Sequence, residues 1–425
     1  MENYKGIEYF RRQLSLKRNR VLLRYKYYEM KHTNIDPGNV IPGPLKMAYN
    51  SVLGWCAKSV DCLADRLVFD QFESDNFDLN MIFKMNNPDT LFDSAVLSAI
   101  ISSCCFIYIS LDESNYPRLQ VIDGANATGE LDPITGLLKE GYAVLARDDN
   151  QNILIEAYFT AGSTTYIDKT NPKNPVAVVS NIAEFPLLVP IIYKPDAMRV
   201  FGHSRISRAC MNLQSKACST ITRADVAAEF YSFPQKYIIG VSDNAEAPMD
   251  IWKATISSML TITKDDDGDS PKVGQFTQQS MEPHISQFKM LAAAFAGETG
   301  LTMDDLGFAT DNPSSVDAIR AAHENLRLTA RKAQRTFGSG LLNAGFLAAC
   351  LRDNFPYQRK QLYLTTPIWQ PIFEPDAAML SGIGDGAIKI NQAVPGYFGA
   401  DNLKKLTGIP TNGVTNGGLN TEVTG

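Results

Sequence analysis

The amino-acid sequence predicts an α+β fold for this chain. Helical spacing of apolar residues dominates positions 1–103, and short strand patterns separated by turn signals follow at 118–180. Long helical patterns return at 204–231, at 283–299 and from 315 onward. Helices followed by a run of consecutive short strands are typical of an α+β domain with an antiparallel sheet. A length of 425 residues leaves room for two or three domains.

The N-terminal part combines three predicted helices with this sheet. Positions 1–32 read as a basic helix with interleaved tyrosines, which suits contact with DNA or, as we favour, pairing with acidic neighbours in an assembly. Further helices are expected at 45–69 and 91–103. The apolar run 94–110 is short for a membrane span and contains serines, so we interpret it as a buried helix leading into a strand. The expected strands are 118–122, 137–147, 153–160, 164–168 and 176–180.

The second half is organised around two helices and a loop. Positions 204–231 carry a thin seam of small apolar residues, which suits helices packed side by side. The helix 283–299 opens with Pro283 and is followed by Gly300, which favours a left-handed C-terminal cap. A capping pattern, Ser314-Ser315-Val316-Asp317, opens the long helix. The remaining predicted elements are the strands 236–240, 259–264 and 272–276, a helix at 248–258, a return strand at 362–371, and helices from 374 and around 400–406.

Two charged stretches stand out. Four arginines of the long helix recur at spacings of seven, four and four, which places them in one stripe. A solvated face, ion pairs to a neighbouring subunit and a surface facing DNA are the alternatives, and we favour subunit pairs. The acidic run 265–269 lacks the spacing of an EF-hand loop and is interpreted as a solvated turn.

The composition narrows the class of protein. The net charge of −6 excludes a uniformly basic nucleic-acid coat protein, and seven cysteines without regular spacing indicate free thiols in a reducing compartment. The four histidines stand alone, so no metal site is expected. The sequence contains no Walker A loop, no G-x-S-x-G elbow and no H-E-x-x-H motif. We therefore expect a protein made in the cytosol that is not an enzyme and holds no cofactor.

The stretch 282–338 resembles the core of tailed-phage portal proteins. In that family a stem helix leads into a tunnel loop, which opens with a glycine and a hydrophobic residue and later carries a Leu-Gly pair. An Asn-Pro-Ser-Ser pattern then leads into a long helix. Both parts are present, as Gly300-Leu301 through Leu306-Gly307 and as Asn312-Pro313-Ser314-Ser315 through Ala318-Ile319. The resemblance extends upstream through 201–209 and covers 200–350 well.

The resemblance implies a portal architecture. The expected parts are a wing at 1–203, a first stem helix at 204–235, a small α/β clip at 236–282, a second stem helix at 283–299, a tunnel loop at 300–314, a long wing helix with a return strand at 315–375, and a helical crown with a loose tail at 376–425. Such a protein forms a ring, expected to be a dodecamer, at one capsid vertex, through which double-stranded DNA is packaged and ejected.

The same resemblance implies the partners and the location. They are further copies of the chain, double-stranded DNA, the terminase large subunit, a head–tail adaptor, and the major capsid and scaffolding proteins, with no membrane involved. The protein is expected in the virion after assembly in the host cytoplasm. A nucleic-acid-processing enzyme such as a nuclease, and another head–tail adaptor or structural protein of the virion, remain as alternatives.

Four groups of candidate site residues follow. The loop has no lysine or arginine, so its acids are expected to repel the phosphate backbone and keep contact with DNA weak. Its candidates are Thr302, Asp304, Asp305, Phe308, Thr310, Asp311, Asn312 and Ser314. The stem candidates that face the channel are Lys216, Arg223 and Lys289. The subunit-interface candidates are Arg320, Arg327, Arg331 and Arg335. The clip candidates for the motor and adaptor are Asp243, Glu246, Asp265, Asp266 and Asp267.

Overall fold

The computed structural model describes residues 4–32, 49–171, 173, 175–232, 236–239, 272–275, 280–308, 319, 321–373 and 377–407. Two units alternate along the chain. One contains 1–26, 59–206 and 314–425, and the other contains 27–58 and 207–313. The first holds the larger sheets and the second holds a helical hairpin, so the predicted α+β class is confirmed.

The core of the first unit is a three-stranded antiparallel sheet with the order β3-β2-β9. Its strands are Pro117–Asp123, Cys104–Leu111 and Leu188–Ile192. Helix α5 (Pro88–Ser102) leads directly into β2, as the apolar run predicted. One face of β2 meets α5, because the thiol of Cys105 lies 3.2 Å from the carbonyl oxygen of Ala95.

Helix α10 (Glu324–Arg352) covers the same face of this sheet. Ile191, which pairs with Cys105, lies against Gly340, where an added Cβ would come within 2.7 Å of the isoleucine side chain. On the opposite face of β2, the ring of Tyr108 packs on Phe159 at 5.5 Å. The sheet is therefore sandwiched between helices and a second sheet.

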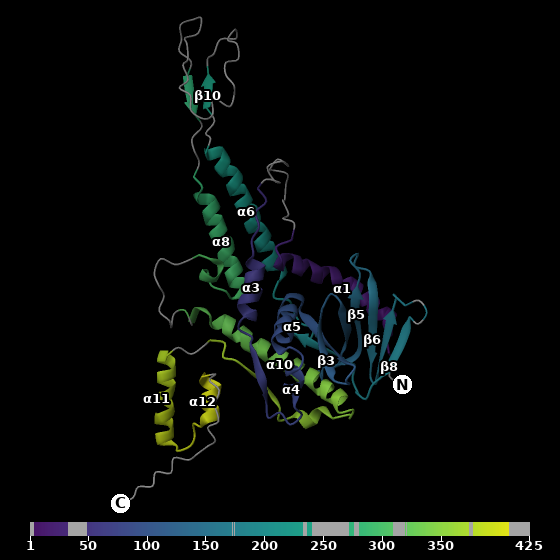
Figure 1. Ribbon diagram of the computed structural model, residues 1–425. Helices are drawn as coiled ribbons and strands as arrows, with labels where there is room; N and C mark the ends of the chain where they lie inside the picture. The colour runs from purple at the N-terminus through teal and green to yellow at the C-terminus, as the bar shows by residue number, and fades with distance from the viewer. Residues whose placement is uncertain are drawn as a thin grey trace, which may run out of the picture. The chain divides into compact units, whose positions relative to one another are not determined.

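The second sheet is a five-stranded antiparallel meander in the order β4-β5-β6-β7-β8. Helix α1 (Ile7–Tyr28) lies along it (Figure 1), with Phe10 and Leu14 buried against Tyr142 and Val144. Four of the strands are those predicted, and β4 was not expected. Their bounds are Ala127–Leu131, Leu138–Arg147, Ile153–Thr160, Ser163–Asp168 and Val176–Ser180.

Two buried carboxylates fasten α1 to this meander. Glu140, which is 2% exposed, accepts hydrogen bonds from the backbone N–H groups of Lys5 (2.8 Å) and Gly6 (3.2 Å) and from the hydroxyl of Tyr158. Because a buried carboxylate is costly unless its oxygens are satisfied, this set of donors positions the start of the helix.

The second carboxylate belongs to Glu156, which is fully buried. It receives the guanidinium of Arg11, whose Nε lies 3.1 Å from Oε2, and the hydroxyl of Tyr142. The ammonium of Lys169 lies 3.4 Å from its other oxygen. Burial alone would raise the pKa of Glu156, but the bonds from Arg11 and Tyr142 outweigh burial and hold the pKa below its ordinary value.

The rest of the first unit surrounds α10. Strand β1 (Phe69–Glu73) pairs with β12 (Thr366–Trp369), and α4 (Leu79–Lys84) packs on α10. The chain continues through a 3-10 turn, η2 (Arg359–Leu362), and ends its described part with α11 (Ala377–Ala393) and α12 (Ala400–Thr407).

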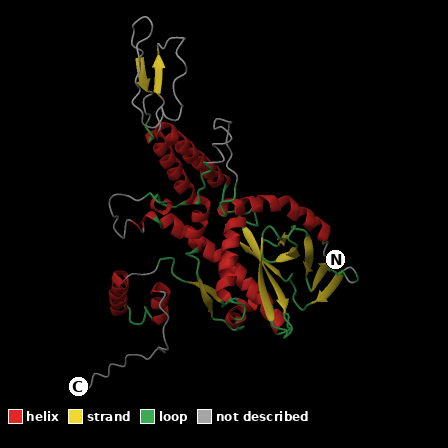
Figure 2. Ribbon diagram, turned by 45° about the horizontal axis from the view of Figure 1, so that its top comes forward, coloured by secondary structure: helices red, strands yellow, loops and turns green. Residues whose placement is uncertain are grey.

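The second unit contains an antiparallel helical hairpin. Helices α6 (Arg208–Ser232) and α8 (Glu282–Thr299) lie side by side (Figures 1 and 2). Strands β10 (Lys236–Ile239) and β11 (Lys272–Gln275), in the insert between them, match two of the predicted strands. They pair with each other, a pairing that the sequence did not predict. Helix α3 (Trp55–Ala64) begins in this unit.

Several predicted boundaries were wrong. The helix expected from 204 starts at Arg208, because the hydroxyl of Ser207 accepts a hydrogen bond from the N–H of Cys210 (3.1 Å) and caps it. Within the described residues, the helix expected at 45–69 covers only Trp55–Ala64, and β1 follows it. The return strand is also shorter than 362–371, because η2 takes up its start.

Strand β9 was missed because it contains Pro190, a residue that usually argues against a strand. The proline is tolerated because β9 is an edge strand that pairs with β2 alone. Some predictions lie outside the described residues, namely the helix 248–258, the strand 259–264, the acidic turn 265–269, the capping pattern at 314–317 and the tail. All seven cysteines are free and buried.

Candidate functional site: a helical hairpin and its loop

The base of the hairpin is held by polar contacts. The hydroxyl of Ser207, at the start of α6, donates to Oε1 of Glu298 near the end of α8 (3.1 Å). Further along α6, the buried amide oxygen of Gln214 accepts a hydrogen bond from the backbone N–H of Cys56 at 2.7 Å. The first contact fixes which turn of α6 faces the end of α8, and the second fastens α6 to α3.

A column of aromatic rings joins α3, α8 and the loop. Trp55 is 5% exposed and packs on Phe288 at 5.3 Å and on Phe295 at 5.5 Å. Phe308, at the far end of the described loop, packs on Phe288 at 5.6 Å. The ring of Phe308 therefore returns to the hairpin, which argues against its predicted role as a residue that faces a channel.

The loop after α8 begins with the predicted cap. Gly300 has a φ of 69°, and the N–H of Leu301 bonds to the carbonyl of Ala296 at 3.1 Å. The following 3-10 turn, η1 (Asp304–Leu306), is closed by Gly307 at a φ of 90°. Two positive-φ glycines at the predicted positions explain why the family pattern requires glycine there.

The loop acids have different roles. Oδ2 of Asp305 accepts hydrogen bonds from the N–H and the hydroxyl of Thr302, both at 2.9 Å, so both side chains serve the turn itself. Asp304 is exposed. Of the predicted loop residues that the structure describes, Asp304 is therefore the one available to a passing molecule. The other predicted loop residues, Thr310, Asp311, Asn312 and Ser314, lie outside the described chain.

The three stem cations fall at two levels. Lys216 lies nine residues beyond Ser207 on α6, and Lys289 lies nine residues before Glu298 on α8. At 1.5 Å per residue, both stand about 14 Å from the contact between Ser207 and Glu298. Arg223 stands about 10 Å further along α6. Both lysines are exposed and Arg223 is half-buried. The three predicted cations therefore form one level of two and a second level of one.

The arginines of the predicted stripe have different surroundings on α10. Arg327 forms a bidentate ion pair with Glu324 of the same helix, with both distances at 2.7 Å, so the pairing of Arg327 with another subunit is not needed to balance its charge. Arg331 and Arg335 are exposed and line a depression in the first unit. Arg320 and the clip acids Asp243, Glu246, Asp265, Asp266 and Asp267 lie outside the described residues.

Sequence reasoning missed three further residues of this depression. They are Lys332, Arg359 of η2 and Trp369 of β12. Lys332 adjoins Arg331 in the sequence, so the basic stripe contained a signal for it. The other two are brought to α10 only by the chain reversal after the helix, which no local pattern announced.

The described part of the chain has neither a membrane-spanning helix nor a cluster of metal ligands. None of its helices combines the length and apolar character needed to cross a bilayer. No group of three or more potential metal ligands gathers among those residues.

Comparison with known proteins finds similarity to phage portal proteins. No protein-family model matches the chain. The portal protein of Mycobacterium phage L5 is 23% identical over 385 residues, which cover 86% of this chain and 77% of that protein. The portal protein of Mycobacterium phage D29 is 21% identical over 408 residues, which cover 90% and 81%. The chain is therefore similar to phage portal proteins over most of its length.

This similarity extends well beyond the stretch 200–350 on which the resemblance was first based, so it includes the sheets as well as the hairpin. Among solved structures, a chain described as "Virion of native gene transfer agent (GTA) particle" aligns with 92% of this chain and 99% of itself, at 12% identity and a TM-score of 0.41. A chain of the "Neck of native GTA particle computed with C12 symmetry" covers 93% and 99%, also at 0.41. The fold assignment rests on the elements described above.

Proposed function

We propose that this portal protein assembles into a ring of about twelve copies at one capsid vertex, and that double-stranded DNA passes through the centre of the ring during packaging and ejection. The observation that carries the proposal is the similarity to two phage portal proteins over most of both chains. In this proposal the hairpin of α6 and α8 is the stem, and the loop from Gly300 lines the narrowest part of the channel.

The described half of the loop has the chemistry that a sliding contact requires. Duplex DNA carries a dense phosphate charge, so each lysine or arginine that binds a phosphate holds the duplex in place. Residues 300–314 contain neither, and Asp304 is exposed. A ring of such loops repels the phosphate backbone of DNA weakly, whatever the base sequence. The cation levels at Lys216, Lys289 and Arg223 provide a sparse counter-attraction along the stem.

The hairpin also presents apolar surface that a lone chain leaves in water. On α8, Ile285 is 44% exposed and Met290 is 61% exposed. Five residues apart, these two side chains lie on different sides of the helix, and each would favour burial against a neighbouring surface. A ring supplies that surface, because the stem of each copy lies beside the stem of the next.

The insert between the two stem helices is proposed as the clip, which would dock the terminase large subunit during packaging and the head–tail adaptor afterwards. Its support is the acidic composition of 236–282, because a charged docking surface speeds association with exchangeable partners. Contacts with the major capsid and scaffolding proteins are part of the same proposal, as are assembly in the host cytoplasm and final location in the virion.

Native mass spectrometry of the purified protein tests the ring. Twelve copies of the 46.9 kDa chain give a particle of about 560 kDa, and this species should dominate at micromolar concentration. The same preparation should leave plasmid DNA intact in the presence of magnesium or manganese. A species of one or two chains would contradict the proposal, and metal-dependent cleavage of the plasmid would favour a nuclease instead.

A further inference from the structure

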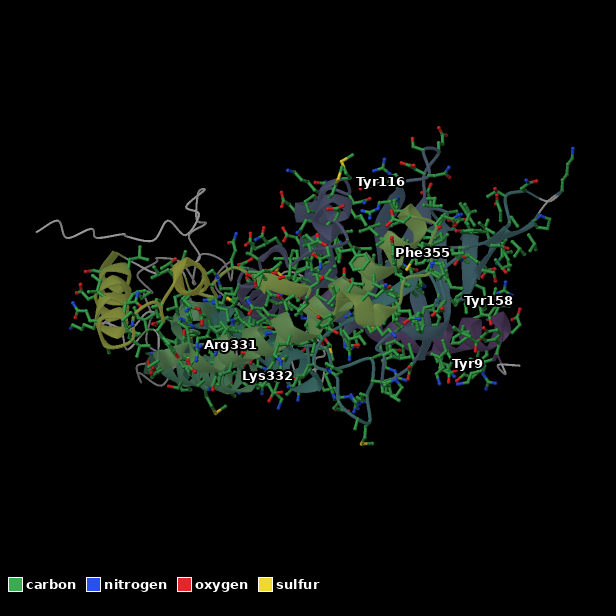
Figure 3. The ribbon with its side chains drawn as sticks, turned by 90° about the horizontal axis from the view of Figure 1, so that it is seen from below. Tyr9, Tyr116, Tyr158, Arg331, Lys332 and Phe355 are labelled. Carbon is green, nitrogen blue, oxygen red and sulfur yellow. The ribbon has the colours of Figure 1, made fainter. Side chains whose placement is uncertain are left out.

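The described part of the first unit contains a depression of about 790 Å³ beside the N-terminal half of α10. Figure 3 shows Arg331 and Lys332 next to each other on this helix. The lining mixes cations with apolar groups, and no carboxylate of the described residues takes part in it. The lining residues are Leu328, Arg331, Lys332, Gln334, Arg335, Ser339, Leu342, Arg359, Pro367 and Trp369. We call this depression the basic pocket.

Three cations of the basic pocket form no ion pair with any described residue. Within the described chain, the ion pairs of α10 belong to Arg327 and Arg352, and not to Arg331, Lys332 or Arg335. Three positive charges therefore lie within two turns of the helix without an ion pair among the described residues, although Arg331 is near enough to Glu324 to help Arg327 lower the pKa of that carboxyl. They repel one another, and an incoming anion would relieve that repulsion.

A fourth cation is partly desolvated. Arg359 is half-buried, and its Nε donates to the amide oxygen of Asn343 at 2.8 Å, which is a neutral partner. Burial lowers the pKa of its guanidinium. A charge removed from water without a counter-charge is costly, so the free chain holds Arg359 at a cost that a carboxylate in the pocket would offset.

Two neutral donors in the same pocket are also unused. Nε1 of Trp369 and Nε2 of Gln334 are buried, and neither has a hydrogen-bond partner among the residues that the structure describes. An indole N–H can only donate. Buried donors normally have acceptors, so these two N–H groups are available to a water, a ligand or another chain that supplies an oxygen. Cations and unpaired donors in one place therefore favour an occupant that supplies acceptor oxygens.

We propose that the basic pocket receives an acidic segment from a second copy of this chain, whose carboxylates contact Arg331, Arg335 and Lys332. The proposal rests on the proposed ring and states which chemistry joins neighbouring copies. In a closed ring every copy offers one face to the next copy and a different face to the previous one, so a pocket on one face requires a complementary segment on the other. The chain has 46 acidic and 40 basic residues, so it can supply such a segment.

The apolar half of the lining favours a peptide over DNA. Leu328, Leu342, Pro367 and the ring of Trp369 form part of the pocket wall. A phosphodiester backbone gains little from these groups, because protein contacts with duplex DNA are mainly hydrogen bonds and ion pairs to phosphate. An acidic segment with an apolar side chain would use both halves of the lining.

The test compares assembly of the full chain with that of two variants. The double variant Arg331→Gln, Arg335→Gln removes two cations of the pocket. The matched control, Arg327→Gln, removes a cation of the same helix whose charge is balanced by Glu324. Sedimentation over a concentration series gives the concentration at which half the chains are in rings. We expect the double variant to raise this concentration at least about tenfold, and the control to change it less than about threefold.

Cross-linking identifies the occupant. A photoreactive p-benzoylphenylalanine in place of Ser339, which is exposed and lines the pocket, should join this site to an acidic peptide of another copy, as read by mass spectrometry. Trp369→Phe replaces the indole by a smaller aromatic ring and removes the N–H donor, so it should weaken assembly by more than any fall in the melting temperature of the unassembled chain accounts for.

The possible failures are distinct. If wild-type rings form and the double variant assembles as well as the control does, the acidic segment is refuted and the ring stands. If the double variant forms rings that have lost affinity for DNA, the pocket holds phosphate and the proposed occupant is wrong. If the wild-type chain stays monomeric, both the ring and the occupant are refuted.

Discussion

The attachment of α1 to the meander offers a sharp test of the energetics, through the substitution Glu156→Gln. Glu156 is fully buried, and its carboxylate is bonded to the Arg11 guanidinium, the Tyr142 hydroxyl and the Lys169 ammonium. The substitution keeps the shape of the side chain, but it leaves the positive charge of Arg11 without its buried partner.

The expected loss of stability depends on how deeply Glu156 and Arg11 are buried. Removing one partner of a buried ion pair costs about 3–5 kcal/mol. The side chain of Arg11 is 31% exposed, so water recovers part of this cost and we expect a loss of about 2–3 kcal/mol. For a unit of this size that lowers the melting temperature by about 4–12 °C. A calorimetric scan at pH 7 measures it, with Glu113→Gln, an exposed glutamate, as the control.

The loss should depend on pH in a defined direction. The folded-state pKa of Glu156 lies below its ordinary value of 4.5, so the unfolded chain binds the proton more tightly. The stabilisation is therefore complete above about pH 4.5 and disappears as the pH falls through the folded-state pKa. The difference between wild type and Glu156→Gln should shrink in that acidic range. Equal melting temperatures at pH 7, or a difference that grows in acid, would refute this reasoning.

Three more predictions concern the hairpin. Trp55→Ala removes two ring contacts beneath α8 and should destabilise the second unit by about 3–5 kcal/mol, measured by urea unfolding, whereas Trp55→Phe should cost less than half of that. Gly300→Ala places a side chain at a φ of 69° and should cost about 1 kcal/mol in the same assay, and no loss would show that the cap tolerates a side chain. Asp304→Lys should leave ring assembly unchanged and slow DNA packaging in a translocation assay. Unchanged packaging would show that this side chain does not meet DNA.

Much of the fold was accessible from local patterns. The four strands predicted between 137 and 180 match β5 to β8. They could be predicted because the alternation of apolar and polar residues and the turn residues between strands are local signals. The hairpin helices were also found, since their apolar spacing persists over many turns. Strand β9 was hidden by Pro190, and α4 was too short, at 6 residues, to show a period.

The candidate site was less accessible, because it depends on contacts between distant parts of the chain. The loop sequence predicted the glycine cap. It did not show that the ring of Phe308 packs on Phe288, or that the carboxylate of Asp305 accepts a hydrogen bond from Thr302. A glutamate within a strand reads as solvent-facing, so the burial of Glu156 became visible only once Arg11 was placed beside it. The basic pocket likewise required residues from α10, η2 and β12 to meet.

The central claim, that the hairpin and its loop surround a path for duplex DNA, is tested most directly by a cryo-electron-microscopy map of the assembled particle at side-chain resolution. The account predicts a closed ring with a central hole, in which the loop beginning at Gly300 faces the axis and Asp304 points into the hole. A map in which this loop points outward, or a chain that remains a single globule at high concentration, would contradict it.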